Sequence, residues 1–353
     1  MPSAFSTTNT QEADGLNLIH SETITVPGIY RMSEKAYHGD PAPTPSLSRS
    51  IAEKLILESP RHARAAHPRM TAQDETPETN SRTRDIGSAT HAMLLGQQTE
   101  IAVLKYPDFK TGGARAHRAE VQERGGIPLL EKDFETATAM VEKARAVLID
   151  NEHPAIRSIV DPDPSAVVFN EVTAAWIDRC GDKWARARMD RLNLAPKLVT
   201  ILDYKTTELS VAPDAVQRAI YNNNYHFQDA FYRRGIRALL PQIDRHEMRL
   251  DFLFIMQEQE PPYEITVARV DAAGRVIGEK MASAAFLMWR KCHAENWWPG
   301  YPGEIVTAEM PAYVDTRWTS KEIEDPHLQG LGHDPMPFYE TQPYRPTPIT
   351  DPC

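Results

Sequence analysis

The sequence of 353 residues is poor in cysteine and has no long apolar run. Its three cysteines, Cys180, Cys292 and Cys353, have no paired spacing, which is typical of a reducing cytoplasm and argues against a zinc or iron–sulfur site. No stretch approaches the roughly 20 apolar residues that cross a bilayer. The first residues lack the basic start and apolar run of a secretory signal. The sequence therefore predicts a cytoplasmic protein with no membrane partner.

An excess of positive charge is also missing. The chain has 39 lysines and arginines against 49 aspartates and glutamates, for a formal net charge of −10. This balance argues against a protein that coats nucleic acid over its whole surface. It leaves a DNA enzyme possible, because phosphate contacts need only a local basic surface.

The chain has three parts of different character. Residues 1–25 are polar and predict a flexible N-terminus. Residues 26–300 carry the periodic apolar patterns of one compact domain. Residues 301–353 are rich in proline and nearly without periodicity. That last part predicts either an arm, lying on the body or on a neighbouring subunit, or a disordered tail.

Apolar spacing within the compact region predicts the order of its elements. Helical spacing occurs at 46–57, 85–95, 128–149, 212–239 and 273–297, and strand patterns at 167–177, 184–192, 197–204, 249–256 and 264–270. Ser46 or Ser48 suits the N-cap of the first helix. This order predicts an α/β fold with a central mixed β-sheet flanked by helices.

Charged residues interrupt two neighbouring strands of this pattern. In the first strand, Arg186, Arg188 and Asp190 alternate with small apolar residues and therefore share one face. The second strand is apolar until it ends in Asp203 and Lys205, which also share a face. The two strands are joined by a short turn. The sequence therefore predicts that two carboxylates and an ammonium group come together.

Phosphodiester hydrolysis is one use for such a group. Two carboxylates can hold Mg²⁺, a hard cation that takes oxygen ligands. The metal polarises a phosphate and lowers the pKa of a bound water, and a lysine stabilises developing negative charge. The alternative is a plain ion pair at the end of a strand, which is the usual meaning of an isolated Asp-x-Lys triplet.

The order of several motifs resembles the PD-(D/E)xK nuclease superfamily, of restriction-endonuclease-like fold. The chain is most similar to the branch that contains the C-terminal nuclease domain of RecE (exonuclease VIII), with RecB-type nucleases and lambda exonuclease as more distant relatives. The matching segments, in the family's order, are 28–30 with 37–38, 46–60, 85–91, 171–190, 201–207 and 225–232. Two features depart from the pattern: methionine instead of proline precedes Asp190, and the tail after Pro299 has no counterpart.

The resemblance implies roles for individual residues. His91, Asp190 and Asp203 would be metal ligands, with the carbonyl of Tyr204 as a further one. Lys205 would be the catalytic lysine. Without the resemblance, His91 would be interpreted as an ordinary helix histidine.

Three more residues match catalytic positions of the family. Glu171 matches an upstream acidic residue that contacts a second metal or the attacking water, although Asp178 and Glu208 lie close enough in sequence to take that place. Gln228 and Tyr232 are four apart on one helix face and match a Q-x-x-x-Y element near the scissile phosphate or the lysine. Their alternative is a polar helix surface.

Arginines near these positions suit DNA-backbone contacts, because a guanidinium can bind phosphate with two hydrogen bonds. The candidates are Arg84, Arg186, Arg188 and Arg191. Each of them taken singly is more often a solvated surface charge.

The resemblance implies a Mg²⁺-dependent exonuclease, with Mn²⁺ as a substitute, that degrades linear double-stranded DNA from 5′ to 3′ in phage or prophage recombination. It also implies a single-strand annealing protein as partner and a homo-oligomeric ring. Two alternatives remain open: an endonuclease or single-strand nuclease on the same fold, and a nuclease-fold module that binds DNA ends or a partner without cutting. The cysteines argue against a relative with an iron–sulfur cluster, since three scattered cysteines cannot supply its four ligands.

Overall fold

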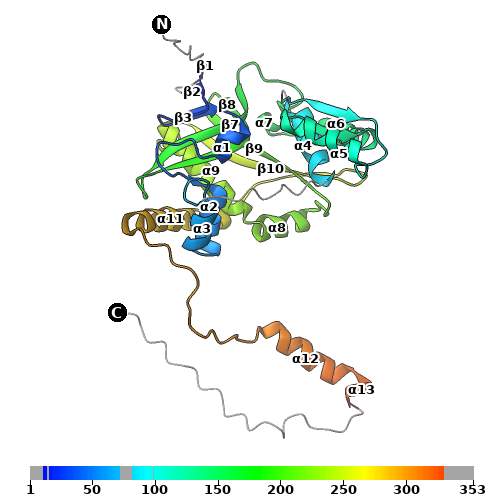
Figure 1. The fold of residues 1–353 in the computed structure, drawn as a ribbon, viewed down its shortest axis with the longest axis vertical. Coiled ribbons are helices and arrows are strands. Elements are labelled where there is room, and N and C mark those ends of the chain that lie inside the picture. The colour runs from blue at the N-terminus through cyan, green and yellow to red at the C-terminus, as the bar shows by residue number, and fades with distance from the viewer. Residues whose placement is uncertain (1–10, 14–15, 72–81, 98, 330–353) are drawn as a thin grey trace. The chain divides into compact units, whose positions relative to one another are not determined.

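The computed structural model describes residues 11–13, 16–71, 82–97 and 99–329. The chain divides into two compact units, Met1–Tyr301 and Pro302–Cys353, which are described separately. Figure 1 shows the elements of both units.

The strands of the first unit are β1 (Gln11–Ala13), β2 (Leu16–His20), β3 (Gly28–Arg31), β4 (Leu47–Ser48), β5 (Ile101–Leu104), β6 (Ile127–Leu130), β7 (Val167–Asp178), β8 (Lys183–Ala195), β9 (Leu198–Thr207), β10 (Arg249–Glu258) and β11 (Ile265–Ala268). Its helices are α1 (Glu34–His38), α2 (Arg49–Leu57), α3 (Pro60–Ala66), α4 (Arg82–Leu95), α5 (Gly112–Glu123), α6 (Glu131–Leu148), α7 (Pro154–Arg157), α8 (Pro213–Asn222), α9 (Tyr225–Leu239), α10 (Pro241–Asp244) and α11 (Ala272–Glu295).

One mixed sheet organises this unit. Its strands are ordered β1-β2-β3-β7-β8-β9-β10-β11, and β4 pairs with β8 outside that path. Strands β7, β8 and β9 form the predicted antiparallel meander, whereas β9 and β10 run parallel. Strands β5 and β6 form a separate parallel pair. The predicted mixed sheet flanked by helices is confirmed.

Helices cover both faces of the sheet (Figure 1). On one face, α2, α9 and α11 bury a large core in which Trp176 of β7 packs edge-on against Phe231 and Phe286. On the other face, α4 and α6 pack over alternate residues of β9 and β10. On the first face, Gly235 lets α9 approach Trp176 closely, because a Cβ there would lie 2.7 Å from the Trp176 ring. The middle of β9 is therefore buried from both sides.

Strands β8 and β9 are paired over only part of their length. Their backbone pairing runs from the turn that joins them as far as Arg191 and Leu202. Nearer the start of β8, Ala185 and Arg186 pair with β4 instead. β9 instead continues beside β10. The central sheet thus contains a local gap, and Asp190 stands at its edge.

Three sequence-based expectations were wrong in detail. The helix expected at 212–239 is broken into α8 and α9, because Asn224 adopts a left-handed conformation with φ of 54°. The helix expected at 128–149 begins as strand β6. The first 25 residues are not wholly flexible: β2 pairs with β3 and buries Leu16 and Leu18.

The predicted N-cap Ser48 is confirmed, since its side chain accepts a hydrogen bond from the backbone N–H of Ile51.

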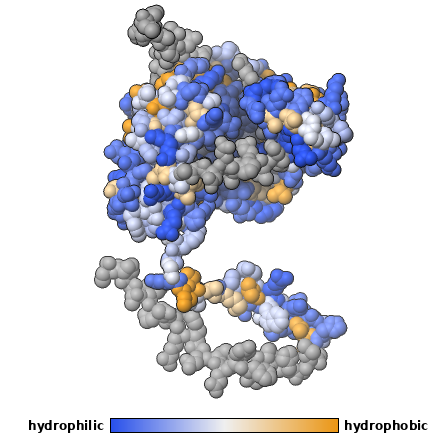
Figure 2. Space-filling model, in the orientation of Figure 1, coloured by the Kyte–Doolittle hydropathy of each residue, from blue (hydrophilic) through white to orange (hydrophobic). Residues whose placement is uncertain are grey.

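The second unit contains α12 (Ala312–Glu324) and α13 (Pro326–Gln329). No residue of α12 is buried, and its Tyr313, Trp318 and Ile323 are exposed. Figure 2 shows apolar residues, in orange, on this helix. The described part of the tail thus contains a helix, which its proline-rich composition did not predict. Residues 330–353 of the tail lie outside the described residues.

Among the described helices, none combines the length and the apolar character needed to cross a membrane.

Candidate metal centre

Asp190 occupies the gap between β8 and β9 and makes contacts that a backbone pair would otherwise make. Its Oδ2 accepts a hydrogen bond from the backbone N–H of Tyr204 at 2.8 Å. The same oxygen lies 3.1 Å from Nε2 of His91 on α4. A single carboxylate therefore links β8, β9 and the helix above them.

The position of His91 depends on a close contact between α4 and β9. Gly87 lies one turn before His91, and a Cβ at Gly87 would stand 2.5 Å from the side-chain oxygen of Thr206. Gln259 donates to that oxygen at 2.8 Å and to the carbonyl of Thr83 at 3.1 Å. The small residue that the sequence places here thus lets α4 rest on the end of β9.

Glu171 lies opposite Asp190 on β7 and has a strained backbone, with φ of 51°. Strain of this kind in a residue with a side chain persists only where the surroundings hold it, and it is concentrated at functional sites. One carboxylate oxygen accepts from Gln97 at 2.6 Å and the other from Arg188 at 2.9 Å. Oε1 of Glu171 also lies 3.6 Å from Nδ1 of His91.

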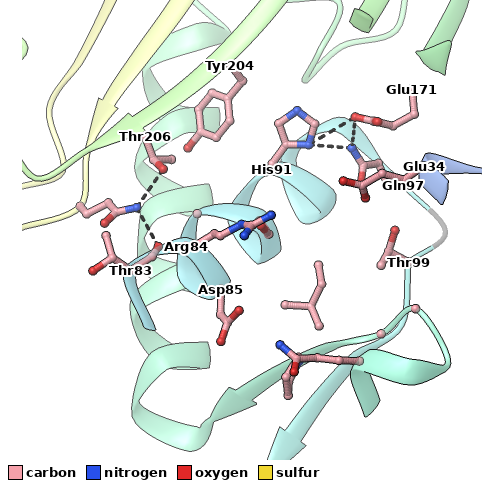
Figure 3. A pocket seen from close by; sticks show the side chains of 18 of the residues that line it. Glu34, Thr83, Arg84, Asp85, His91, Gln97, Thr99, Glu171, Tyr204 and Thr206 are labelled. Carbon is pink, nitrogen blue, oxygen red and sulfur yellow. Dashed lines mark hydrogen bonds and ion pairs between the residues drawn. The ribbon is translucent and has the colours of Figure 1, made fainter. Parts of the chain in front are cut away.

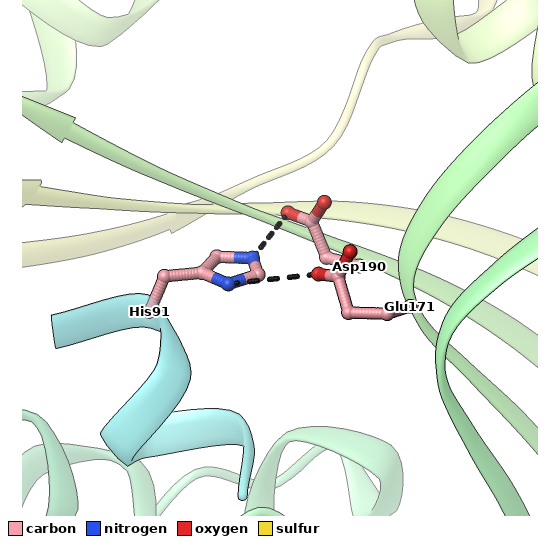
Figure 4. A group of neighbouring side chains, drawn as sticks. All are labelled: His91, Glu171 and Asp190. Atoms are coloured by element: carbon pink, nitrogen blue, oxygen red, sulfur yellow. Dashed lines mark ion pairs between the residues drawn. The ribbon is translucent and has the colours of Figure 1, made fainter. Parts of the chain in front are cut away.

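The three side chains His91, Glu171 and Asp190 form one group (Figure 4). One potential ligand atom of each lies within 4.8 Å of those of the other two. They come from α4, β7 and β8, and all three are half-buried. The predicted residues His91, Glu171 and Asp190 are thus brought together.

Asp203 and Lys205 form a neighbouring pair that is fixed from α9. The ammonium group of Lys205 lies 2.6 Å from Oδ1 of Asp203 and 5.4 Å from the ring centre of Tyr225. Gln228 donates to Oδ2 of Asp203. Asp203 is only 3% exposed, so both of its oxygens are held in place.

Electrostatic interactions couple these groups. Burial raises the pKa of Glu171, and the neighbouring Asp190 raises it further. Burial and the neighbouring Asp190 raise the pKa of Asp203 more than Lys205 and Gln228 lower it. Burial acts the same way on Asp190, but His91 and Lys205 outweigh it and its pKa is lowered. For His91, burial lowers the pKa, yet Asp190, Glu171 and Asp203 together outweigh it and the net shift is upward.

A cleft of about 880 Å³ opens beside this group. Its walls include Arg84 and Asp85 of α4, Thr99, and the stretch 125–128 that leads into β6. Figure 3 shows His91, Glu171 and Gln97 meeting at one end of it. Most of the labelled side chains are polar, so the cleft suits a charged or strongly polar ligand.

The donor set fits a hard divalent cation. Two carboxylates and one imidazole lie close together, and the mutual repulsion of the carboxylates would be relieved by a positive ion. Oxygen-rich sites with an imidazole suit Mg²⁺ or Mn²⁺ better than soft metals. Asp203 does not belong to this compact group but interacts electrostatically with Asp190.

Two arginines predicted as DNA contacts have structural partners instead. Arg186 is 2% exposed and binds the Asp40 carboxylate, the Ser46 carbonyl and hydroxyl, and the Tyr37 carbonyl. Arg191 is 7% exposed and donates to the carbonyl of Ser158 and the side chain of Asn170. Strand alternation placed Arg186 on the same face of β8 as Asp190, but segments distant in sequence cover both arginines.

The other predicted residues have more varied surroundings. Arg188 is half-buried, holds Glu171 and also donates to the carbonyl of Met32. Arg84 is exposed at the cleft. Tyr232 is 8% exposed and packs with the Phe252 ring at 5.9 Å between centres, so it belongs to the core.

Sequence reasoning missed Gln97 and Glu34, which both line the cleft. Gln97 follows a left-handed glycine at the end of α4, a helix-stop signal that the sequence displays. Glu34 lies in the first turn of α1, after the N-cap Ser33. Neither matches a motif, and only the fold brings them to the site.

Comparison with known proteins shows which family the chain matches. Residues 50–309, more than half of the chain, match the model of a family described as a PDDEXK-like domain of unknown function (DUF3799). A candidate exonuclease from Eubacterium rectale, known from a crystal structure, is similar at a TM-score of 0.44 and 12% identity, over 77% of this chain and 92% of that one. So low a TM-score supports no argument about function. No curated protein matches the sequence.

Proposed function

The chain belongs to this PDDEXK-like family, as its motifs indicated, and from that premise we propose that it is a metal-dependent DNA nuclease whose reaction centre contains Asp190, Asp203 and Lys205. The main support for this proposal is that these residues converge with His91 and Glu171 at the gap between β8 and β9. A plain ion pair between Asp203 and Lys205 would not need this further group of ligands beside it.

His91, Glu171 and Asp190 would hold the cation, with Asp203 and the carbonyl of Tyr204 completing its ligands. When bound, Mg²⁺ or Mn²⁺ supplies Lewis-acid polarisation of a phosphate and acidifies water. Metal affinity is expected to fall as carboxylates and imidazole take up protons.

The protein's own residues position the catalytic groups and stabilise the charge that develops during the reaction. Burial lowers the pKa of Lys205, but Asp203 and Asp190 together outweigh it, so the pKa is raised and Lys205 carries its positive charge at neutral pH. Its ammonium group can stabilise the charge that develops on the transferred phosphoryl group. Gln228 holds the carboxylate of Asp203 and so fixes the place of that ammonium group. Tyr232 shares the helix face of Gln228 and is proposed to support this arrangement from the core.

We propose linear duplex DNA as the substrate, degraded from a 5′ end in phage-type recombination, with a single-strand annealing protein as partner and a homo-oligomeric ring as assembly. These points rest on the resemblance to the RecE branch. Arg84, which lines the cleft, and Arg188, which binds Glu171 of the metal-ligand group, are the proposed phosphate contacts.

End-labelled linear duplex DNA with Mg²⁺, beside a closed circle, tests the proposal. The linear DNA should shorten from one end and the circle should survive. Lys205→Ala should lose activity by roughly 10²–10³-fold, the usual effect of removing one charge-stabilising donor. Lys197→Ala, an exposed lysine in the turn of the same hairpin, is the matched control and should remain active.

Two other outcomes would change the assignment. Cutting of the circle would make the enzyme an endonuclease. An intact substrate with Mg²⁺ and with Mn²⁺, for duplex and single strands alike, would favour a binding module.

A further inference from the structure

The end of α4 turns the chain back on itself. Gly96 adopts a left-handed conformation with φ of 69°, and the N–H of Gln97 bonds the carbonyl of Ala92 at 2.9 Å. This is a Schellman-type helix end. Six residues along a regular helix would place Gln97 on a different face from His91. The turn instead brings the Gln97 side chain beside the His91 ring.

The amide of Gln97 bridges two members of the metal-ligand group. Its Nε2 lies 2.6 Å from Nδ1 of His91 and 2.6 Å from Oε1 of Glu171. A primary amide nitrogen carries two hydrogens, so one group can serve both acceptors. Figure 3 shows the three side chains converging, with dashed lines that join each of them to the other two.

From this geometry we propose that Gln97 is a positioning residue of the metal centre, which selects the ring nitrogen of His91 that binds metal and, before the metal binds, holds Glu171 toward the same point. Because the amide occupies Nδ1, the nitrogen left for a cation is Nε2, which faces Asp190 at 3.1 Å. The inference rests on the proposed function, since it presumes that this group binds a metal.

The amide can bond either form of the ring, but its bond to Glu171 belongs to the metal-free one. A metal on Nε2 requires the proton to be on Nδ1, and rotation of the amide then presents its oxygen as an acceptor for that proton and releases the bond from its nitrogen to Glu171. Hydrogen bonds of this kind to the second nitrogen commonly fix the orientation of a metal-binding histidine. Glu171 keeps its second anchor throughout, because Arg188 binds its other oxygen.

Mn²⁺ binding to the full-length protein tests the inference without relying on nuclease activity. Calorimetry should show Mn²⁺ affinity about 10–100-fold weaker in Gln97→Leu than in the wild type, the usual effect of losing such a partner. Its melting temperature should stay close to that of the wild type. Gln217→Leu makes the same chemical change at an exposed position on α8 and should bind Mn²⁺ normally.

Pulsed electron paramagnetic resonance on ¹⁵N-histidine-labelled protein gives a second readout. The wild type should show coupling of Mn²⁺ to a histidine nitrogen, and Gln97→Leu should weaken or abolish it. A merely structural role would leave this coupling unchanged in the folded, Mn²⁺-loaded variant. Equal affinity and equal coupling in the two proteins would overturn the inference alone. Absence of Mn²⁺ binding in the wild type would overturn the metal centre and this inference with it.

Discussion

Two polar networks lie along the same strand and differ in what surrounds them. The Asp40 network contains Asp40, Ser46, His67 and Arg186, and the Asp190 network contains His91, Glu171, Arg188 and Asp190. Each combines carboxylate, histidine and arginine, and the two arginines are two residues apart on β8. The side chains of Asp40 and His67 are 0% exposed, whereas those of Glu171 and Asp190 are 26% and 22% exposed.

The balance of charge separates the two networks further. One carboxylate, Asp40, faces Arg186 at 2.9 Å, His67 at 3.3 Å and Arg69 at 3.5 Å. Burial raises the pKa of Asp40, but the bond from His67 and the charge of Arg186 outweigh it, so the net pKa is lowered. In the Asp190 network carboxylates repel one another, and the pKa of Glu171 is raised. A polar cluster with its charges matched internally stabilises the fold, whereas one with excess carboxylate and an open side suits a cation.

The strongest test exchanges one aspartate in each network for asparagine. Asp40→Asn leaves the buried Arg186 without its counter-charge and should cost about 3–5 kcal/mol of unfolding free energy, measured in urea. Asp190→Asn should keep most of its stability and lose activity on the order of 10³-fold, as for loss of an electrostatic stabiliser. Folded Asp40→Asn should still cut DNA. Equal loss of stability in the two variants would contradict the distinction between the networks.

The comparison also shows how far the sequence could be interpreted. Alternation along β8 correctly grouped Arg186, Arg188 and Asp190 on one face, because strand periodicity is local. It could not distinguish the buried Arg186 from the half-buried Arg188, which binds Glu171. Asp40 and Ser46, which cover Arg186, lie about 140 residues away in the chain.

Some residues of the candidate site could likewise be predicted from the sequence, and others could not. The Asp-x-Lys spacing and the helix of His91 are visible as motifs, and the structure brings these residues together. Gln97 could not be found, since a residue six positions from His91 reaches it only through the left-handed turn at Gly96. The break at Asn224 was missed because helical spacing continues across it.

Moving α4 should disturb only the Asp190 network. Gly87→Ala places a Cβ 2.5 Å from the Thr206 oxygen and 3.1 Å from Gln259. We expect an overpacking cost of about 1–3 kcal/mol and weaker Mn²⁺ binding by calorimetry, because His91 moves with the helix. Gly113→Ala, where a Cβ meets nothing within 4 Å, is the control.

A double variant separates the steric effect from other causes. Thr206→Ala removes the oxygen against which the new Cβ would press, so Gly87→Ala combined with Thr206→Ala should recover part of the Mn²⁺ affinity. If the double variant binds as weakly as Gly87→Ala, close packing of α4 on β9 is not what places His91.

The smallest expected effect is a difference in the sign of the pH dependence. A lowered pKa, as for Asp40, stabilises the fold above the unfolded value, and that contribution is lost as pH falls through the folded pKa. A raised pKa, as for Glu171, does the opposite: stability falls as pH rises from the unfolded value through the folded one. Metal-free Glu171→Gln should therefore melt about 1–3 °C higher than the wild type at pH 7, a shift of the size of a change below 1 kcal/mol.

This difference should vanish below about pH 4, where the carboxyl is protonated in both states. Saturating Mn²⁺ should reverse the order at pH 7, since a ligand that binds only the folded protein stabilises in proportion to its affinity, and the wild type keeps the carboxylate. Thermal melts at both pH values, with and without Mn²⁺, measure all of this. A Glu171→Gln variant that melts below the metal-free wild type at pH 7 would mean that Gln97 and Arg188 neutralise Glu171 fully, as Arg186 and His67 do for Asp40.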